Sequence, residues 1–214
     1  MKTVAVVDYG MGNLRSVTKA VEHIADPTTK VILTSDAKQI ISADRVIVPG
    51  QGAAKGCMDA LRQYELDEVL RNVSVNKPFL GICMGLQVLF ERSDENDGTD
   101  CLGVIEGKVR YFPDNATFKT GEHKLPHMGW NRVCRQAQHA LWSGVPDSAR
   151  FYFVHSYYVQ PRDASVIMAT SEYGIDFVCA IGRENIFAVQ FHPEKSAADG
   201  LRLLHNFITW DGSK

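Results

Sequence analysis

The sequence predicts an α/β fold with a mostly parallel central sheet flanked by helices, and with an antiparallel β portion in the C-terminal half. Over residues 1–90, short apolar runs alternate with segments of helical periodicity, which is typical of a parallel sheet covered on both faces. After residue 103, β-rich runs separated by Pro, Gly and Asn replace that alternation. The length of 214 residues suits one α/β domain, predicted over residues 1–214.

The parallel part is predicted from apolar runs and their spacing. Strands are expected at residues 4–7, 31–33, 45–48 and 79–82, where the runs are short and apolar. A first helix is expected over Leu14–Ile24, because Val17, Val21 and Ile24 share one face. A second helix is expected over residues 57–73, and residues 85–91 begin a third.

The second half is predicted to be β-rich up to its last helix. Residues 93–103 are polar and loop-like, and residues 104–159 are expected to form several strands. A hairpin is expected between residues 177–181 and 186–191, around residues 182–185. Leu201, Leu204, Phe207 and Ile208 then recur at helical spacing and predict a final helix.

The composition excludes several functional classes. The formal net charge of -2 does not favour a nucleic-acid partner, and no apolar run is long enough for a signal peptide or a membrane span. The five cysteines are odd in number and contain no C-x-x-C pair, so we expect reduced thiols in a cytoplasmic protein.

The segment Gly81-Ile82-Cys83-Met84-Gly85 has the G-x-C-x-G pattern between a predicted strand and a predicted helix. This is the cysteine form of a nucleophile elbow, in which a tight turn exposes the nucleophile at a helix N-terminus. The amide of Met84 would then point at an oxyanion. The alternative is a buried structural cysteine in a glycine-rich turn.

A second pattern, Phe191-His192-Pro193-Glu194, follows an apolar run. In extended chain, residues i and i+2 point the same way, so His192 and Glu194 are expected side by side, as a base and its orienting acid. The alternative is a surface loop with an incidental histidine. The order Cys, His, Glu argues against an ordinary esterase or lipase, in which the acid precedes the histidine.

Three segments, VIVPGQG, GICMGLQVLF and FAVQFHPEKS, together resemble the class I, triad-type glutamine amidotransferases over residues 46–196. DYGMGNLRSV, LPHMGWN and FVHSYYV are similar to the members of that family that act in histidine biosynthesis. The resemblance implies the fold predicted above, and hydrolysis of glutamine to glutamate and ammonia through a thioester on the cysteine.

The resemblance also implies roles for residues of this chain. Cys83 is the nucleophile, His192 the base and Glu194 its orienter, while the oxyanion is held by the Met84 amide and by the loop containing Gln51 and Gly52. That loop is PGQG where the family usually has PGVG, which leaves open the amide that completes the oxyanion hole. The implied glutamine pocket consists of Gln87, Glu95, His155, Ser156 and Tyr157. No cofactor is expected, and no metal, because the histidines lack zinc-type spacing.

A partner is expected because the chain has no phosphate-binding signature for the acceptor substrate. By resemblance, the partner is a (β/α)8-barrel synthase that forms a heterodimer with this chain and receives the ammonia. Asn13, Trp130 and Lys195 are the implied contact residues, although Trp130 could equally be a core residue and Lys195 a solvated one. The rival functions are an amidotransferase of another pathway, a stand-alone γ-glutamyl hydrolase and a non-catalytic binding subunit.

Overall fold

The computed structural model describes the chain except residues 1, 113–117, 119, 122 and 214. Its strands are β1 (Lys2–Val7), β2 (Thr29–Thr34), β3 (Arg45–Gly50), β4 (Phe79–Cys83), β5 (Phe90–Ser93), β6 (Thr99–Asp100), β7 (Ile105–Tyr111), β8 (His127–Arg132), β9 (Cys134–Arg135), β10 (Arg150–His155), β11 (Tyr157–Pro161), β12 (Ile167–Glu172), β13 (Asp176–Arg183) and β14 (Ile186–Val189). Its helices are α1 (Leu14–Ile24), α2 (Ala37–Ser42), α3 (Ala54–Gln63), α4 (Asp67–Asn76), α5 (Met84–Gln87) and α7 (Ala197–Thr209). Short 3-10 turns are η1 (Glu95–Asp97), η2 (Ala140–Trp142), η3 (Ala164–Val166) and η4 (Pro193–Lys195).

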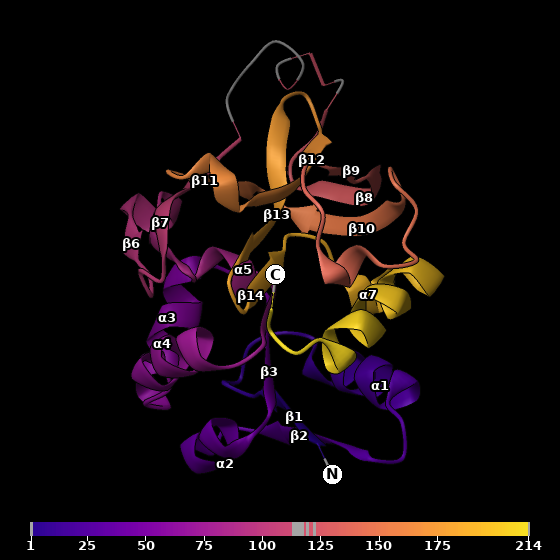
Figure 1. The fold of residues 1–214 in the computed structure, drawn as a ribbon. Helices are drawn as coiled ribbons and strands as arrows, with labels where there is room; N and C mark the ends of the chain where they lie inside the picture. The colour runs from indigo at the N-terminus through magenta and orange to yellow at the C-terminus, as the bar shows by residue number, and fades with distance from the viewer. Residues whose placement is uncertain (1, 113–117, 119, 122, 214) are drawn as a thin grey trace.

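The main sheet joins a parallel part to an antiparallel part. Its strand order is β2-β1-β3-β4-β14-β13-β11-β7-β5-β6, and all neighbours from β2 to β14 are parallel. From β14 onward the pairing is antiparallel through β13, β11 and β7. The strands β8 and β10 form a separate antiparallel pair, seen beside β9 and β12 in Figure 1. The prediction of a mostly parallel central sheet with an antiparallel C-terminal part is therefore confirmed.

The parallel part buries both of its faces. In β3, Ile47 belongs to one hydrophobic cluster, whereas Val46 and Val48 belong to the other, as the alternation of side chains along a strand requires. The first cluster includes residues of α1 and α7, and the second includes residues of α3, α4 and α5. Figure 1 shows α1 and α7 together on one side of these strands, and α3 and α4 on the other.

Several predicted elements are confirmed and some were wrong. The first helix, the four early strands, the hairpin of β13 with β14 and the last helix are all present. The single helix predicted over residues 57–73 is instead α3 and α4, because Glu65 adopts a left-handed φ of 55° and ends the first helix. The helix predicted to begin over residues 85–91 is a single turn, and Phe90 already starts β5.

Some other local features of the structure were not predicted from the sequence. The helix α2 was not predicted, although Asp36 caps it by accepting a hydrogen bond from the Lys38 amide. The segment predicted as a loop at 93–103 contains η1 and β6. Part of the segment 104–159, predicted to form strands, lies outside the described residues. All five cysteines are free, and within the described part of the chain no helix is long and apolar enough to cross a membrane.

Candidate active site

Cys83 is held in a strained turn at the end of a central strand. It is the last residue of β4 and has φ 55° and ψ -106°, a region that residues with a side chain rarely adopt. Such outliers persist only where the surrounding structure enforces them, and they cluster at functional sites. Because α5 has only one turn, the helix dipole expected from the sequence contributes little, and the backbone turn itself presents the sulfur.

Glycines on the neighbouring backbone make this turn sterically possible. A Cβ on Gly85 would lie 1.8 Å from the carbonyl oxygen of Val48, and one on Gly81 would lie 2.6 Å from the oxygen of Gly85. On β3, a Cβ on Gly50 would lie 2.3 Å from the hydroxyl of Tyr9. Gly81 and Gly85 therefore pack against backbone and Gly50 against a buried side chain, so only glycine fits at these positions.

His192 and Glu194 form a buried pair just after β14. The Nδ1–H of His192 donates to Oε1 of Glu194 at 2.8 Å, and the two side chains are 2% and 1% exposed. The sequence placed both residues in extended chain, but only His192 is extended. Glu194 lies in η4, a turn that Pro193 begins, and this turn folds the carboxylate back onto the ring. The other ring nitrogen, Nε2, is buried without a hydrogen-bond partner.

Opposing effects act on the imidazole of His192. Burial by itself lowers the pKa of His192, but its interactions with Cys83 and Glu194 outweigh burial and raise that pKa to about 10. The ring therefore has a strong tendency to keep a proton once it has one. With Nδ1 occupied by Glu194, Nε2 is the nitrogen left for a proton of the thiol.

The end of β3 and the loop that follows it are each held by a donor from a neighbouring side chain. The hydroxyl of Tyr9 donates to the carbonyl of Pro49 at 2.9 Å, and the thiol of Cys57 donates to the carbonyl of Gln51 at 3.4 Å. Burial raises the pKa of Cys57 to about 12, so this thiol stays protonated and keeps its donor. Gln51 and Gly52 line the same cavity as Cys83.

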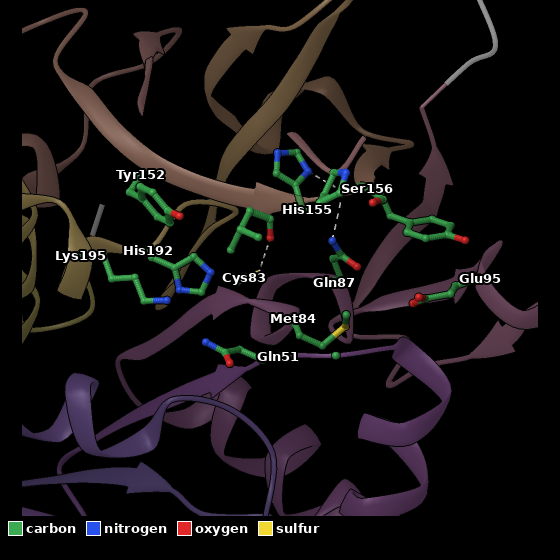
Figure 2. A pocket seen from close by; sticks show the side chains of 14 residues that line it. Gln51, Cys83, Met84, Gln87, Glu95, Tyr152, His155, Ser156, His192 and Lys195 are labelled. Carbon is green, nitrogen blue, oxygen red and sulfur yellow. Dashed lines mark hydrogen bonds between the residues drawn. The ribbon is translucent and has the colours of Figure 1, made fainter. Parts of the chain in front are cut away.

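A cavity of about 480 Å³ collects most of the residues selected from the sequence. Figure 2 shows His192 and Lys195 on one side of it, Cys83, Met84 and Gln51 near its centre, and Glu95 on the other side. The predicted residues that line it are Gln51, Gly52, Cys83, Met84, Gln87, Glu95, His155, Ser156, Tyr157, His192 and Lys195. They come from distant segments, so only the fold brings them together.

Two polar residues of this cavity are fixed by backbone groups. Gln87 is 2% exposed, and its Nε2 donates to the carbonyl of Tyr157 at 3.1 Å. Glu95 accepts a hydrogen bond from the Ala54 amide at 2.7 Å, at the start of α3. Its charge also adds to burial in raising the pKa of Tyr157 above the ordinary value. The Glu95 carboxylate is thus held at the edge of the cavity, and its negative charge acts on Tyr157, which lines the cavity.

His155 belongs to a buried chain of neutral rings. Its Nδ1–H donates to the carbonyl of Tyr157 at 2.8 Å, which leaves Nε2 to accept from Nδ1 of His127 at 3.0 Å. Nε2 of His127 then accepts from the Asn131 amide at 3.3 Å. Burial, helped by the neighbouring histidine, lowers the pKa of His155 to about 3, and burial lowers that of His127 to about 4. Both rings are therefore neutral near pH 7.

The predicted partner residues lie in different places. Asn13 precedes α1 and is not among the residues that line the cavity. Trp130 is 46% exposed on β8 and packs edge-on against Tyr152 at 6.3 Å between ring centres, so the alternative of a core tryptophan is wrong. Lys195 places its Nζ 5.8 Å from the ring centre of Tyr152.

Sequence reasoning missed Tyr152, Val154 and Gln190, which lie in or beside the cavity. Tyr152 and Val154 line the cavity from β10, and Gln190 donates its Nε2 hydrogen to Sγ of Cys83 at 3.7 Å. Gln190 stood inside the segment FAVQFHPEKS, where a fully polar side chain at the end of an apolar strand was an available signal. No comparable signal marked Tyr152 or Val154.

Comparison with known families gives a match over nearly the whole chain. The sequence profile described as "Glutamine amidotransferase class-I" matches residues 5–210. A protein of Pseudomonas aeruginosa named imidazole glycerol phosphate synthase subunit HisH 1 is 52% identical over 213 residues, covering 99% of both chains. The subunit HisH of Dechloromonas aromatica is 56% identical over 211 residues, covering 98% of this chain and 97% of that protein.

Solved structures show the same fold at low sequence identity. One described as a glutamine amidotransferase has a TM-score of 0.71 at 18% identity, covering 96% of this chain and 97% of its own. Another, described as the glutaminase domain of Trypanosoma brucei CTPS with bound acivicin, has a TM-score of 0.64 at 17% identity, covering 99% of this chain and 95% of its own.

Proposed function

We propose, from the premise that this chain belongs to the class-I glutamine amidotransferase family, that it is the glutamine-hydrolysing subunit of an imidazole glycerol phosphate synthase. In that role it serves histidine biosynthesis by releasing ammonia from L-glutamine. Its two relatives named above carry the name of this synthase and match end to end. The distant solved structures support the fold alone.

The reaction begins with the thiol of Cys83. Its proton passes to Nε2 of His192, while Nδ1–H of that ring keeps its bond to Glu194. The thiolate attacks the side-chain amide carbon of glutamine, and the amide oxygen becomes an oxyanion. Glu194 stabilises the imidazolium formed in this step, and the raised pKa of His192 describes the same effect.

The second half of the reaction returns the proton and frees the cysteine. His192 gives its proton to the amide nitrogen, the carbon–nitrogen bond breaks, and ammonia leaves a γ-glutamyl thioester on Cys83. Water, deprotonated by His192, then attacks the thioester carbonyl and releases glutamate. The amide of Met84 and an amide of the Gln51–Gly52 loop are the proposed oxyanion donors, each contributing about 3–4 kcal/mol to the transition state.

One observation carries this proposal. A buried His192–Glu194 pair at 2.8 Å and a cysteine held at φ 55° line or adjoin one cavity, although more than a hundred residues separate them in sequence. The alternatives of a structural cysteine and an incidental surface histidine do not account for this geometry, since neither requires a strained backbone or a buried unpaired ring nitrogen.

We propose that the rest of the cavity recognises glutamine. Glu95 is suited to the substrate ammonium group, because it is a fixed carboxylate at the cavity edge. Gln87 has a buried Oε1 without a partner, which can accept a hydrogen bond from the substrate. Ser156 and Tyr157 complete the lining, and His155 is proposed to keep the Tyr157 backbone in place.

The partner proposal is a heterodimer with a (β/α)8-barrel synthase. Ammonia loses its nucleophilicity when protonated in water, so a closed interface would protect it on its way to the acceptor. Exposed Trp130 offers an aromatic anchor for such an interface, and Lys195 and Asn13 are the further proposed contacts. Five free cysteines fit a cytoplasmic location, and the net charge of -2 gives no reason to add a nucleic-acid or membrane partner.

The test uses the chain co-purified with the candidate barrel subunit. Wild-type complex should hydrolyse glutamine and make imidazole glycerol phosphate, measured as glutamate release and product formation. The Cys83→Ala complex should lose glutamate release completely and still make product when ammonium salt replaces glutamine. A His192→Ala complex should behave in nearly the same way.

The alternatives give different results in the same assay. Loss of both glutamine- and ammonium-dependent synthesis in Cys83→Ala would make Cys83 structural. Full glutaminase activity of the isolated chain, unchanged by the barrel subunit, would favour a stand-alone γ-glutamyl hydrolase. A deletion strain that requires a vitamin or a purine, rather than histidine, would indicate an amidotransferase of another pathway.

A further inference from the structure

A buried carboxamide touches the sulfur of Cys83 and has no role in the mechanism above. Gln190 follows β14, is fully buried, and donates from Nε2 to Sγ of Cys83 at 3.7 Å. Its Oε1 accepts from Nε2 of Gln87 at 3.0 Å. Both ends of the amide are therefore occupied, one of them by the reacting atom.

The orientation of this amide follows from a backbone carbonyl. The oxygen of Tyr157 can only accept, so Gln87 must turn its NH2 group toward it. The second hydrogen of that NH2 group goes to Gln190, which must therefore present its oxygen to Gln87 and its own NH2 group to the sulfur. Flipping either amide would bring two donors or two acceptors face to face.

Two groups then have opposite effects on the ionisation of the sulfur. As a thiol, Sγ–H of Cys83 donates to the carbonyl of Val154 at 4.0 Å, which favours the protonated form. When the proton leaves for His192, that bond is lost, while the N–H of Gln190 remains. A hydrogen bond to an ionised acceptor is about twice as strong as one between neutral groups, so Gln190 favours the thiolate.

We infer that Gln190, oriented by Gln87 and the Tyr157 carbonyl, is a positioning residue that holds the sulfur of Cys83 and stabilises its thiolate. This inference rests on the proposed role of Cys83 as nucleophile. It gives Gln87 a second task besides the proposed substrate contact: its NH2 group orients Gln190, while its buried Oε1 has no hydrogen-bond partner. A purely structural role for Gln190 would only satisfy buried polar groups and would leave the ionisation of the sulfur unchanged.

The test measures how fast iodoacetamide alkylates Cys83 at different pH values, using the full chain and peptide mass spectrometry. Gln190→Leu removes the donor, and Gln190→Glu keeps the acceptor for Gln87 but places a carboxylate beside the sulfur. We expect the pH midpoint of Cys83 alkylation to rise by about one unit in Gln190→Leu, and further in Gln190→Glu. Exposed Cys134 reports in the same sample as an internal reference with an unchanged profile.

A matched control separates this effect from loss of stability. Ile186→Ala makes a cavity at the far end of β14, beside Phe79, and should lower the melting temperature without moving the alkylation midpoint. In the complex with the barrel subunit, Gln190→Leu should lower kcat for glutamine about tenfold at neutral pH and regain activity at higher pH. Its KM for glutamine should change less than about threefold.

Each outcome decides the inference. If the wild-type complex had no glutaminase activity and its Cys83 were alkylated with the same pH profile as Cys134, the proposed function itself would be wrong. An active wild type with folded Gln190 variants that keep the wild-type midpoint would overturn only the role of Gln190. If both variants failed to fold while Ile186→Ala folded, Gln190 would belong to the core and the inference would again be overturned.

Discussion

The parallel part of the main sheet and the separate β8–β10 pair position the functional groups by different physical means. In the parallel part, Cys83 is fixed by its backbone, since glycines let β3, β4 and the following turn approach within van der Waals contact. In the β8–β10 pair, His155 and His127 are fixed by hydrogen bonds among side chains and carbonyls. Steric fixation depends on residue size and not on pH, whereas the histidine chain depends on both rings staying neutral.

The strand β14 and the residues that follow it connect the two parts, through backbone pairing on one side and a hydrogen bond on the other. The strand β14 pairs in parallel with β4, which ends in Cys83, and antiparallel with β13. Beyond the strand, the amide of His192 donates to the carbonyl of Tyr152 on β10 at 2.9 Å. His192 is thus held between the two parts, so the proposed triad depends on how the two parts are aligned with each other.

The largest effect is expected in the backbone-fixed part. Gly85→Ala should prevent stable folding or destabilise the protein by more than about 3 kcal/mol, because its Cβ would overlap the Val48 carbonyl 1.8 Å away. The measurement is urea unfolding followed by circular dichroism. Gly56→Ala, in α3 with only the flexible end of Met11 at 3.6 Å, is the matched control and should stabilise by about 0.5–1 kcal/mol. Equal stability of the two variants would show that the turn is not sterically fixed.

The next effect tests the connecting segment. Glu194→Gln keeps an acceptor for Nδ1–H of His192 but removes the charge that stabilises the imidazolium, so kcat for glutamine should fall about 10²- to 10⁴-fold. KM should change little, because Glu194 does not line the cavity. Steady-state kinetics of the complex measure both quantities. Glu184→Gln, in the exposed turn between β13 and β14, should leave kcat unchanged, and an equal loss in both variants would refute the role of the charge.

The smallest effect is expected from the hydrogen-bonded part. His127 and His155 have lowered pKa values in the folded state, about 4 and about 3, whereas an unfolded histidine titrates near 6.5. Acid therefore protonates the unfolded state first, so the stabilisation is complete above about pH 6.5 and is lost as pH falls from there to about 4 for His127 and about 3 for His155. Each ring should reduce the free energy of unfolding by about 2 kcal/mol between pH 7 and pH 5.

Variants isolate this contribution from other titrating groups. His127→Phe keeps the stacking on Phe153 and Tyr173 but cannot be protonated, so the loss of unfolding free energy between pH 7 and pH 5, measured by urea unfolding, should be about 2 kcal/mol smaller than in the wild type. His23→Phe, at an exposed position at the end of α1, should keep the wild-type slope. A wild-type slope in His127→Phe as well would mean that the buried rings do not control acid stability.

Several features of this protein could be predicted because they depend on neighbours in sequence. Apolar runs gave the positions of β1 to β4, and Val17 and Val21 gave the buried face of α1. The G-x-C-x-G pattern indicated a strand, a tight turn and a helix start, and Cys83 has the strained φ that such a turn implies. The break at Glu65 was not predictable, since no glycine or proline marks it.

By itself, the sequence determined the order of the first four strands and the first helix, the family, and the residue types able to perform the chemistry. Only the tertiary structure decided which amide faces the sulfur, why Glu194 reaches His192, and that Tyr152 and Gln190 join them. The physical reason is the separation along the chain over which each interaction acts. Steric and hydrophobic preferences depend on residues that are only a few positions apart. A hydrogen bond between residues 83 and 190 forms only after the strands carrying them have been brought together in one sheet.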